Sequence, residues 1–284
     1  MEFKLSEIKK LSFIGKDICF TVNDKNFEQI IKKLNPCQIK GISSRLVYYW
    51  KQNKRPIPSR YLKEICRHTE IKSINIVSFS VNSGKKIIIP DKENLQFYYL
   101  LGLILGDGCL SFNNKHLHGG SYTLQITMRY QKEAKKVKNL IKDLFNINSS
   151  IYKGKGCYNI CTFSKTLVIF LNKLFSIPLG KKYKLIKVPT IINKDSNYIR
   201  YFLKGLFDSD GNIYKNKNKW CIQIRQKSKI FIIQIHSLFK KIGIEIRGPY
   251  YDKANNSWLL WSNKKETVDN FMRHINTIEF LEPS

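Results

Sequence analysis

Two stretches of similar sequence, LLGLILGDG at residues 100–108 and LKGLFDSDG at residues 203–211, organise the rest of the chain. Each is an apolar run that ends in an aspartate, Asp107 or Asp210, followed by a glycine. Neither run reaches the roughly 20 apolar residues that a membrane-spanning helix needs. We therefore predict two buried helices, each ended by a glycine in the left-handed conformation that only glycine adopts without steric cost.

Small residues recur four positions apart within both predicted helices. They are Gly102 and Gly106 in the first helix and Gly205 and Ser209 in the second. Residues at this spacing share one helix face, and small side chains there allow two backbones to approach closely. We therefore predict that the two helices pack directly against each other.

The two aspartates would then lie at the C-terminal ends of two touching helices. A carboxylate is unfavourable there because the helix dipole is negative at that end, and because a second carboxylate is close by. A divalent cation bound between Asp107 and Asp210 would relieve both penalties. The sequence therefore predicts a metal site, the alternative being two buried helices whose acids are incidental.

The two stretches resemble the paired motifs of single-chain LAGLIDADG homing endonucleases. Matched position by position, Asp107 and Asp210 correspond to the residues that bind catalytic metal in that family. The earlier acid of the motif is present as Asp208 in the second stretch but is Leu105 in the first. That earlier position is usually structural in the family, so the resemblance still implies an active endonuclease.

Hydrophobic periodicity predicts the same order of elements after each stretch, which is two strands, a helix, two strands and a helix. The expected fold class is α+β, with two pseudo-symmetric αββαββα repeats that form a DNA-binding saddle and a small N-terminal α/β-hairpin domain. We assign the N-terminal extension to residues 1–90, the first repeat to 91–180 and the second repeat to 181–284.

The N-terminal extension contains GISSRLVYYWKQNKRPIPSRYLKEICRH at residues 41–68. Ser43 and Ser59 are suitable caps for two short helices. Gly41 would form the turn, and the arrangement resembles a repressor-type helix-turn-helix, whose second helix enters the major groove of DNA. In that interpretation the DNA-facing side chains lie on the helix that Ser43 caps, and they are Ser44, Arg45, Tyr48 and Lys51. A helical hairpin that only packs on the core is the alternative.

The charge of the chain indicates a polyanionic partner. Fifty Lys and Arg residues oppose 21 Asp and Glu residues, giving a formal net charge of +29. Such an excess usually neutralises phosphates, so we expect double-stranded DNA as the partner, with intron RNA as a second possibility. The N-terminus has no apolar signal segment, which favours the cytoplasm or an organellar matrix over secretion.

The resemblance implies further site residues. Mg²⁺ is the expected metal, with two or more ions shared by the aspartates and with the backbone carbonyls of Gly106 and Ser209 completing the coordination. A basic residue is expected before the last helix of each repeat, and aligning those helices pairs Lys165 with Lys265. Lys264 is a competing choice, and ordinary surface lysines are the alternative interpretation.

A polar residue at the end of the second strand of each repeat orients water in this family. Gln226 fits this position in the second repeat. In the first repeat the position falls on Met128 or Gln131, depending on a small insertion, and we expect Gln131.

Alternate residues on the second strands are the expected base-contacting groups, although alternation does not fix which face meets DNA. The candidates are Thr123, Gln125, Thr127 and Arg129 in the first repeat, Gln223, Arg225 and Trp220 in the second, with Lys227 expected at phosphates.

Taken together, these features predict a monomeric, metal-dependent homing endonuclease that makes double-strand breaks at a long DNA site. Two other functions fit a LAGLIDADG-type chain. One is a transcription regulator, because one known regulator family joins a LAGLIDADG-like domain to a helix-turn-helix, although such domains typically lack both acids. The other is a maturase that helps an intron RNA fold.

Overall fold

The computed structural model describes most of the chain from residue 85 onward and parts of the N-terminal extension. The described residues are 2–4, 18–22, 31, 42–52, 57–58, 61–62, 65, 73–81, 85–113, 120–182 and 185–275.

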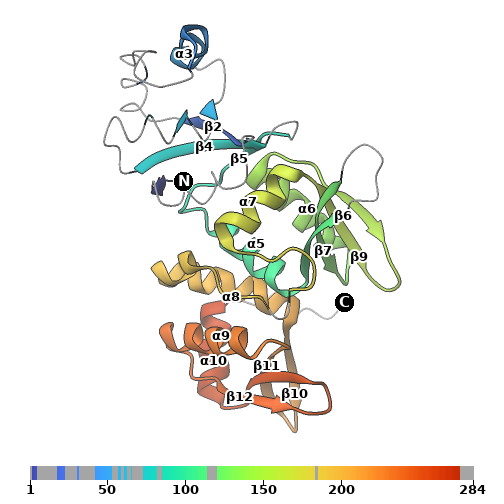
Figure 1. Cartoon of the computed structure of the whole chain (residues 1–284). Helices are drawn as coiled ribbons and strands as arrows, with labels where there is room; N and C mark the ends of the chain where they lie inside the picture. Colours follow the sequence, from blue (N-terminus) through green and yellow to red (C-terminus); the bar gives the residue numbers. More distant parts are fainter. Residues whose placement is uncertain are drawn as a thin grey trace.

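Two helices, α5 (Leu95–Gly106) and α8 (Ser196–Asp210), cross the centre of the molecule and carry the two motif stretches (Figure 1). Each begins at a side chain that accepts a hydrogen bond from the first turn, Asn94 for α5 and Asp195 for α8. Such caps satisfy amide groups that have no partner within the helix. The predicted helices and their boundaries are therefore confirmed to within a few residues.

The two helices touch through their glycines. A Cβ atom at Gly102 would overlap the backbone oxygen of Phe202 and lie 2.6 Å from the Leu206 nitrogen. A Cβ atom at Gly205 would likewise overlap the carbonyl of Tyr99. The predicted close packing through small residues is therefore confirmed, because no larger residue fits without moving the backbones apart.

The glycines that follow the aspartates have a different role from the one predicted. Gly211 is extended, with φ −89° and ψ 161°, and Gly108 is not among the residues with positive φ. A Cβ at Gly108 would lie 2.5 Å from the Ile104 Cα, and one at Gly211 would lie 2.5 Å from the Phe207 oxygen. Glycine is therefore required by close approach of the preceding helical turn and not by a left-handed backbone.

The first repeat continues from α5 with an antiparallel sheet and two helices. Its strand order is β6-β7-β9-β8. The elements are β6 (Gly108–Asn113), β7 (Ser121–Met128), α6 (Gln131–Phe145), β8 (Ser150–Lys153), β9 (Tyr158–Phe163) and α7 (Lys165–Phe175).

The second repeat has the same order and a matching sheet, β10-β11-β13-β12. It is reached through a short 3-10 helix, η2 (Thr190–Lys194). The elements after α8 are β10 (Gly211–Asn216), β11 (Lys219–Gln226), α9 (Lys229–Lys241), β12 (Arg247–Asp252), β13 (Ser257–Ser262) and α10 (Lys265–Ile275). The predicted double αββαββα order is confirmed.

Strand register relates the two repeats residue by residue. Gly108 pairs with Ile126 on β7, and Gly211 pairs with Ile224 on β11. Positions on β7 therefore correspond to positions on β11 that are 98 residues later, the difference between 224 and 126. In Figure 1 both sheets lie on the same side of the α5–α8 pair, as expected for a saddle.

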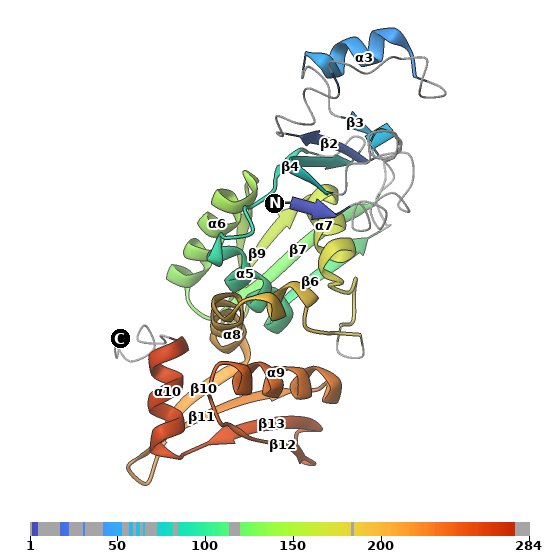
Figure 2. The same cartoon turned by 90° about the vertical axis from the view of Figure 1, so that its left-hand side faces the viewer.

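The described part of the N-terminal extension includes a separate sheet and the helix α3. Its strands are β1 (Glu2–Lys4), β2 (Ile18–Val22), β3 (Ile57–Pro58), β4 (Ser73–Val81) and β5 (Ile87–Ile88), and its helix is α3 (Ser44–Lys51). The sheet lies next to α7 of the first repeat (Figure 2). The amide of Val81 donates to the Thr166 hydroxyl across 3.3 Å, and Phe79 lies 6.0 Å from Phe170 between ring centroids.

The predicted cap of the helix in the extension is confirmed, since Ser43 accepts from the amide of Leu46. Val47 and Trp50 are buried, whereas Arg45, Tyr48 and Lys51 are exposed. Gly41, the proposed turn, and much of the helix expected from Ser59 lie outside the described residues, so the helix-turn-helix stays a prediction. β4 and β5 pair antiparallel, which supplies a hairpin of the kind expected for this domain. Among the described helices, none has the length and apolarity to cross a membrane.

The packing of α5 on α8 leads to a prediction about stability. Replacing Gly by Ala inside an exposed helix normally stabilises it by about 1 kcal/mol. At Gly102 and Gly205 we expect the opposite sign, a loss of about 1–3 kcal/mol, because the added methyl group overpacks the helix contact. Chemical denaturation of Gly102→Ala and Gly205→Ala measures this, with the exposed Ser196→Ala as the control. A gain in stability in either glycine variant would contradict the close-packing argument.

Candidate active site and nucleic-acid interface

Asp107 and Asp210 lie together at the C-terminal ends of α5 and α8. Asp107 is the C-cap of α5, and Asp210 is the last residue of α8. A Cβ on Gly106 would overlap Ser209 and lie 3.1 Å from Oδ2 of Asp210, so the second carboxylate reaches the end of the first helix. The predicted meeting of the two acidic helix ends is therefore observed.

The pKa values of both acids reflect this crowded position. Burial, together with the charge of Asp107, raises the pKa of Asp210 from 3.8 to about 6. Burial also raises the pKa of Asp107, whose side chain is the more exposed of the two, and Lys182 opposes that shift. Both shifts mean that the ionised acids are disfavoured here, as expected for carboxylates that share a partly desolvated site.

Lys182 is a cation whose charge acts on both acids. Its ammonium group donates to the carbonyl oxygens of Ile104 at 3.1 Å and Gly108 at 2.6 Å, and also to that of Gly106. The carbonyl oxygens in the last turn of a helix have no partner within the helix, so a lysine there satisfies them and offsets the helix dipole. Burial lowers the pKa of Lys182, while Asp210 and Asp107 oppose that change.

Sequence reasoning missed Lys182 because the connector between the repeats carries four lysines, at 181, 182, 184 and 187. The connector is fixed by Leu179, which bridges to Leu110 of β6, and by the amide of Gly180, which donates to the Leu110 oxygen at 2.7 Å. Gly180 has φ +76°, a conformation that glycine adopts without strain. This turn directs Lys182 to the C-terminal end of α5. Nothing in the local sequence distinguishes Lys182 from the neighbouring lysines.

Gln226 contacts the site as expected. Its side-chain amide donates to Oδ2 of Asp210. Strand register places Met128, and not Gln131, at the corresponding position of the first repeat. Met128 and Gln226 each end a strand two positions before the N-cap of the following helix, so the first repeat has no insertion relative to the second. The expectation for Gln131 was therefore wrong, since it is the exposed first residue of α6.

The paired lysines Lys165 and Lys265 occupy equivalent positions, each at the start of the last helix of its repeat. The amide of Val168 bonds to the Ser164 oxygen, as that of Val268 bonds to the Lys264 oxygen, which supports the predicted alignment.

Neither lysine of this pair is the cation found at the acids. The ammonium of Lys165 lies 5.9 Å from the Tyr122 ring, and Tyr122 is four residues along β7 from Ile126, the partner of Gly108. Four residues of a strand span roughly 13 Å. The expectation that Lys165 and its equivalent, Lys265, lie beside the aspartates is therefore corrected in favour of Lys182.

Burial resolves which face of the first sheet is open. On β7 the side chains of Leu124, Ile126 and Met128 are buried, whereas Thr123, Gln125 and Thr127 are partly exposed. The open face carries a polar cluster, because Asn159 of β9 accepts from Gln125 at 3.2 Å and from Thr127 at 2.9 Å. The proposed base-contacting residues on this strand thus share the accessible side.

The second sheet has the same parity. Ile222 and Ile224 are buried, whereas Gln223 and Arg225 are partly exposed on the other face. Trp220 has the parity of the buried positions, although 40% of its surface is exposed near the hairpin end. Gln223 corresponds to Gln125, so both repeats present a glutamine at the same place.

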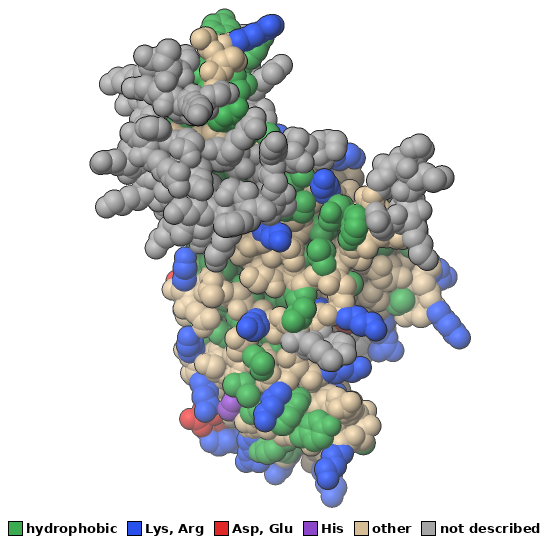
Figure 3. Space-filling model, in the orientation of Figure 1, with side chains coloured by type: hydrophobic (Ala, Val, Ile, Leu, Met, Phe, Trp, Pro, Cys, Tyr) green, Lys and Arg blue, Asp and Glu red, His purple; other side chains and the backbone are tan. Residues whose placement is uncertain are grey.

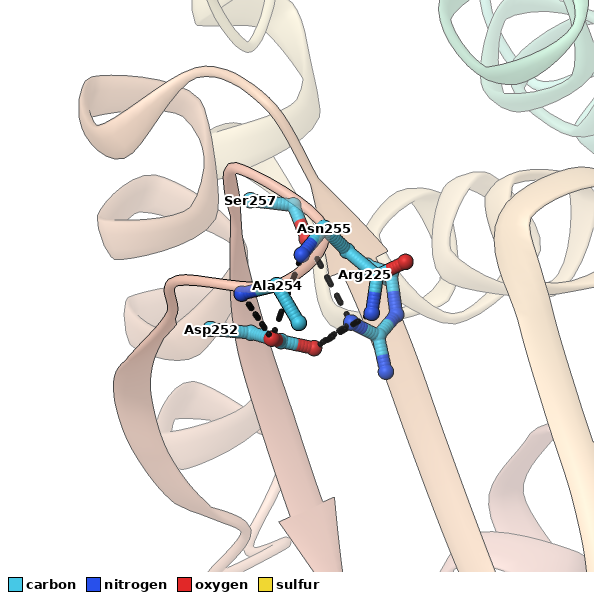
Figure 4. Close-up of polar contacts among 5 residues, drawn as sticks. All are labelled: Arg225, Asp252, Ala254, Asn255 and Ser257. Atoms are coloured by element: carbon cyan, nitrogen blue, oxygen red, sulfur yellow. Dashed lines mark hydrogen bonds and ion pairs between the residues drawn. The ribbon is translucent and has the colours of Figure 1, made fainter.

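Arg225 is held by the hairpin that joins β12 to β13 (Figure 4). Its Nη1 atom donates to a carboxylate oxygen of Asp252 and lies 3.4 Å from the Ser257 hydroxyl. Hydrogen bonds from Asn255 and Arg225 lower the pKa of Asp252 to about 2, so this carboxylate is ionised under ordinary conditions.

Two further basic candidates follow the second strands. Arg129 and Lys227 are exposed in the bends before α6 and α9. Lys227 lines the same pocket as Asp210, Lys182 and Gln226. Figure 3 shows Lys and Arg side chains spread over the visible face, with few acidic groups among them.

The donor groups at the acids suit a divalent cation. Among the described residues no cluster of three or more His, Cys, Asp or Glu side chains exists, so protein ligands would be two carboxylates and backbone carbonyls. Oxygen ligands of this kind fit Mg²⁺, which usually binds through one or two carboxylates. The Gly106 carbonyl accepts from Lys182, so it becomes a metal ligand only if the ammonium moves.

The raised pKa of Asp210 leads to a prediction for the metal-free protein. Because the folded pKa is about 6 and the ordinary value is 3.8, the unfolded chain loses this proton first as pH rises. The charge therefore destabilises the fold above about pH 6 but not below about pH 4. We expect Asp210→Asn to raise the free energy of unfolding by up to about 3 kcal/mol at about pH 7.5 and to leave it unchanged near pH 4.

Denaturation of wild type and variant in the presence of a chelator at the two pH values measures this difference. Asn keeps an oxygen that can accept from Gln226, so the change isolates the charge. A variant that is less stable than wild type at about pH 7.5 would mean that the carboxylate is net stabilising, and the repulsion argument would fail.

Comparison with known families matches both repeats. Residues 197–276 match a family described as LAGLIDADG-like domain, and residues 96–172 match a family described as WhiA LAGLIDADG-like domain. The matched segments include the two motif helices and together cover more than half of the chain.

Solved structures share the fold. The I-DmoI structure in complex with DNA and Mn is 22% identical, with a TM-score of 0.50, and covers 66% of this chain and 98% of that one. A variant of I-DmoI with its target DNA in the presence of Mg gives 21% identity and a TM-score of 0.51, covering 64% of this chain and 96% of that one. At this identity the similarity establishes the fold alone.

Curated relatives include much longer proteins. An A-type ATP synthase protein of Pyrococcus abyssi is 30% identical over 57% of this chain, and elongation factor 2 of Methanopyrus kandleri is 23% identical over 93%. The chain spans only 15% and 21% of these proteins. Their activities are unrelated to each other, so neither is transferred to this chain.

The motif match in each repeat and the shared fold place the chain among the LAGLIDADG proteins, with one motif helix in each of two repeats.

Proposed function

We propose that this protein is a site-specific homing endonuclease that makes metal-dependent double-strand breaks in DNA. The observation that carries the proposal is the meeting of Asp107 and Asp210 at the ends of two packed motif helices, beside Lys182 and Gln226. The site lies between two sheets whose open faces are polar, in a chain with a formal charge of +29.

A divalent cation fits the chemistry of this site. Asp107 and Asp210 would hold it, and I-DmoI, which shares the fold, was solved with DNA and Mn. Bound there, such an ion would neutralise charge at the phosphoryl oxygens and would favour ionisation of a water molecule. The raised pKa values of both aspartates support this role, because a cation would remove the electrostatic penalty.

Lys182 and Gln226 would serve the same reaction through their own groups. The Lys182 ammonium lies against the carbonyl oxygens at the end of α5, and its charge acts on both acids, so it can stabilise negative charge that develops on a phosphate. Gln226 orients the Asp210 carboxylate through its amide and keeps a carbonyl oxygen available to position water. Both roles need the scissile phosphate to lie over the joined helix ends.

The open faces of the two sheets would bind the duplex. Gln125, Thr127 and Gln223 present amide and hydroxyl groups suited to base edges, while Arg129 and Lys227 are suited to phosphates. The exposed Arg45, Tyr48 and Lys51 of α3 would extend the contact if the N-terminal helix-turn-helix forms as predicted. Binding of intron RNA stays a prediction.

A transcription regulator is the second candidate. The match of the first repeat to the WhiA LAGLIDADG-like domain favours it, and a helix with an exposed basic face in the extension would suit such a protein. The two acids distinguish the candidates. A regulator does not require two carboxylates so close together that their ionisation is disfavoured. A metal-dependent nuclease requires them, because they would bind the cation.

The first test of the proposal removes the carboxylates one at a time. We expect Asp107→Asn and Asp210→Asn each to abolish double-strand cleavage in Mg²⁺ while leaving specific DNA binding largely intact, because these groups hold metal and do not contact bases. Duplexes from a randomised library, incubated with purified protein, provide the assay. Specific binding without cleavage by the wild type would support the regulator instead.

The second test distinguishes Lys182 from the other lysines. We expect Lys182→Met to lower the single-turnover cleavage rate on the order of 10²-fold at saturating protein, as for the loss of an oxyanion donor. Lys165→Met and Lys265→Met remove the same charge away from the acids and serve as controls. If Lys182→Met cleaves normally but unfolds more readily, the lysine is only a cap of α5.

A further inference from the structure

The β12–β13 hairpin builds a second polar site next to the acids. Asp252 closes β12 and accepts backbone hydrogen bonds from Ala254 at 3.1 Å and Asn255 at 3.3 Å, and a side-chain bond from Asn255 at 2.9 Å. These bonds fix the carboxylate within its own turn. Figure 4 shows the fixed carboxylate pointing toward Arg225 of β11, which is separated from β12 by β13 in the sheet.

Arg225 is oriented by this carboxylate through one of its three nitrogens. Both of its bonds, to Asp252 and to the Ser257 hydroxyl, are made by Nη1. Among the described residues no partner is found for Nε or Nη2, and the side chain is 34% exposed. One edge of the guanidinium is therefore anchored, and the Nε–Nη2 edge remains as a pair of parallel donors facing the open side of the sheet.

Two parallel donors match two kinds of acceptor in a duplex, a phosphate or the O6 and N7 atoms of guanine. The charge of Asp252 decides between them. It neutralises Arg225, which reduces attraction to a phosphate, and it would repel phosphate oxygens directly. The O6 and N7 atoms of guanine carry no formal charge, so the carboxylate of Asp252 weakens their attraction to Arg225 only slightly. A side chain that is already held in one conformation also loses less conformational entropy on binding.

We propose that Arg225, positioned by Asp252, recognises a guanine in the major groove of the half-site bound by the second repeat. The inference rests on the proposed DNA-binding function. Arg225 lines the same pocket as Asp210 and Gln226, so the guanine lies on the cleavage-proximal side of that half-site.

The first repeat lacks an equivalent site. By strand register Arg225 corresponds to Thr127, which donates to Asn159 instead of presenting a cation. The guanine preference should therefore occur in one half-site only. Thr127 supplies a matched control at the equivalent place in the fold.

The test is selection of bound duplexes from a randomised library in a chelator, followed by single base-pair changes in the selected site. For wild type we expect one guanine whose replacement weakens binding roughly 5- to 150-fold, the equivalent of 1–3 kcal/mol. Arg225→Gln should reduce that discrimination to near unity and leave the other positions unchanged. Thr127→Val is expected to alter preference only in the half-site bound by the first repeat and to leave this guanine preference intact.

The variant Asp252→Asn distinguishes a role of Asp252 in positioning Arg225 from a purely structural role in the hairpin. Asn keeps the Oδ1 acceptor for the two backbone amides of the turn, so the hairpin should persist while the charge and the anchor on Arg225 are lost. We expect weaker discrimination at the same base pair, and no additional loss when the change is combined with Arg225→Gln. A purely structural role would weaken binding to all sequences equally and leave the base preference unchanged, which would overturn the role of Asp252.

Other outcomes overturn the proposal directly. If Arg225→Gln weakens every sequence alike and lowers the slope of log affinity against log salt by about 0.9, Arg225 contacts a phosphate. If wild type selects no common sequence, neither the inference nor site-specific binding holds. Selection of a guanine-containing site without cleavage in Mg²⁺ would leave this inference standing and remove only the nuclease.

Discussion

The direct contact between α5 and α8 is the constraint on which the rest of the structure depends. Gly102 and Gly205 allow the two backbones to meet, and a single methyl group at either position would overlap the opposing helix. The contact fixes the two repeats relative to each other, and with them the two sheets that flank the helices (Figures 1 and 2). It also brings two helix C-terminal ends together, which creates the site.

The electrostatic consequence of that contact is an excess of negative potential at one point. Two helix ends and two aspartates converge there, and burial raises the pKa values of both acids. Lys182 supplies one positive charge and satisfies carbonyls of the last turn of α5. One monovalent group leaves the pair incompletely neutralised, which is the condition that favours a divalent cation; a cation bound there would in turn attract a phosphate.

The pseudo-symmetry of the fold does not extend to its polar groups. Gln226 of the second repeat faces Asp210, whereas the equivalent position in the first repeat is the buried Met128. The connector that supplies Lys182 occurs once, because it joins the first repeat to the second. Each difference places polar or charged groups unequally about the approximate twofold axis, so the two strands and the two half-sites of a DNA target would meet different surroundings.

The sequence alone determined the motif helices, their close packing, the order of the strands and the convergence of Asp107 and Asp210, because these depend on local periodicity and on small residues at fixed spacing. Tertiary structure alone decided which strand face is open, since alternation defines two faces without showing which one helices cover. It also identified Lys182 among the four connector lysines, and it showed that Met128 and not Gln131 is the equivalent of Gln226. Both assignments depend on how distant segments fold back and pair. Contacts between segments far apart in the chain carry no local sequence signal, and the charged residues of this site are placed by such contacts.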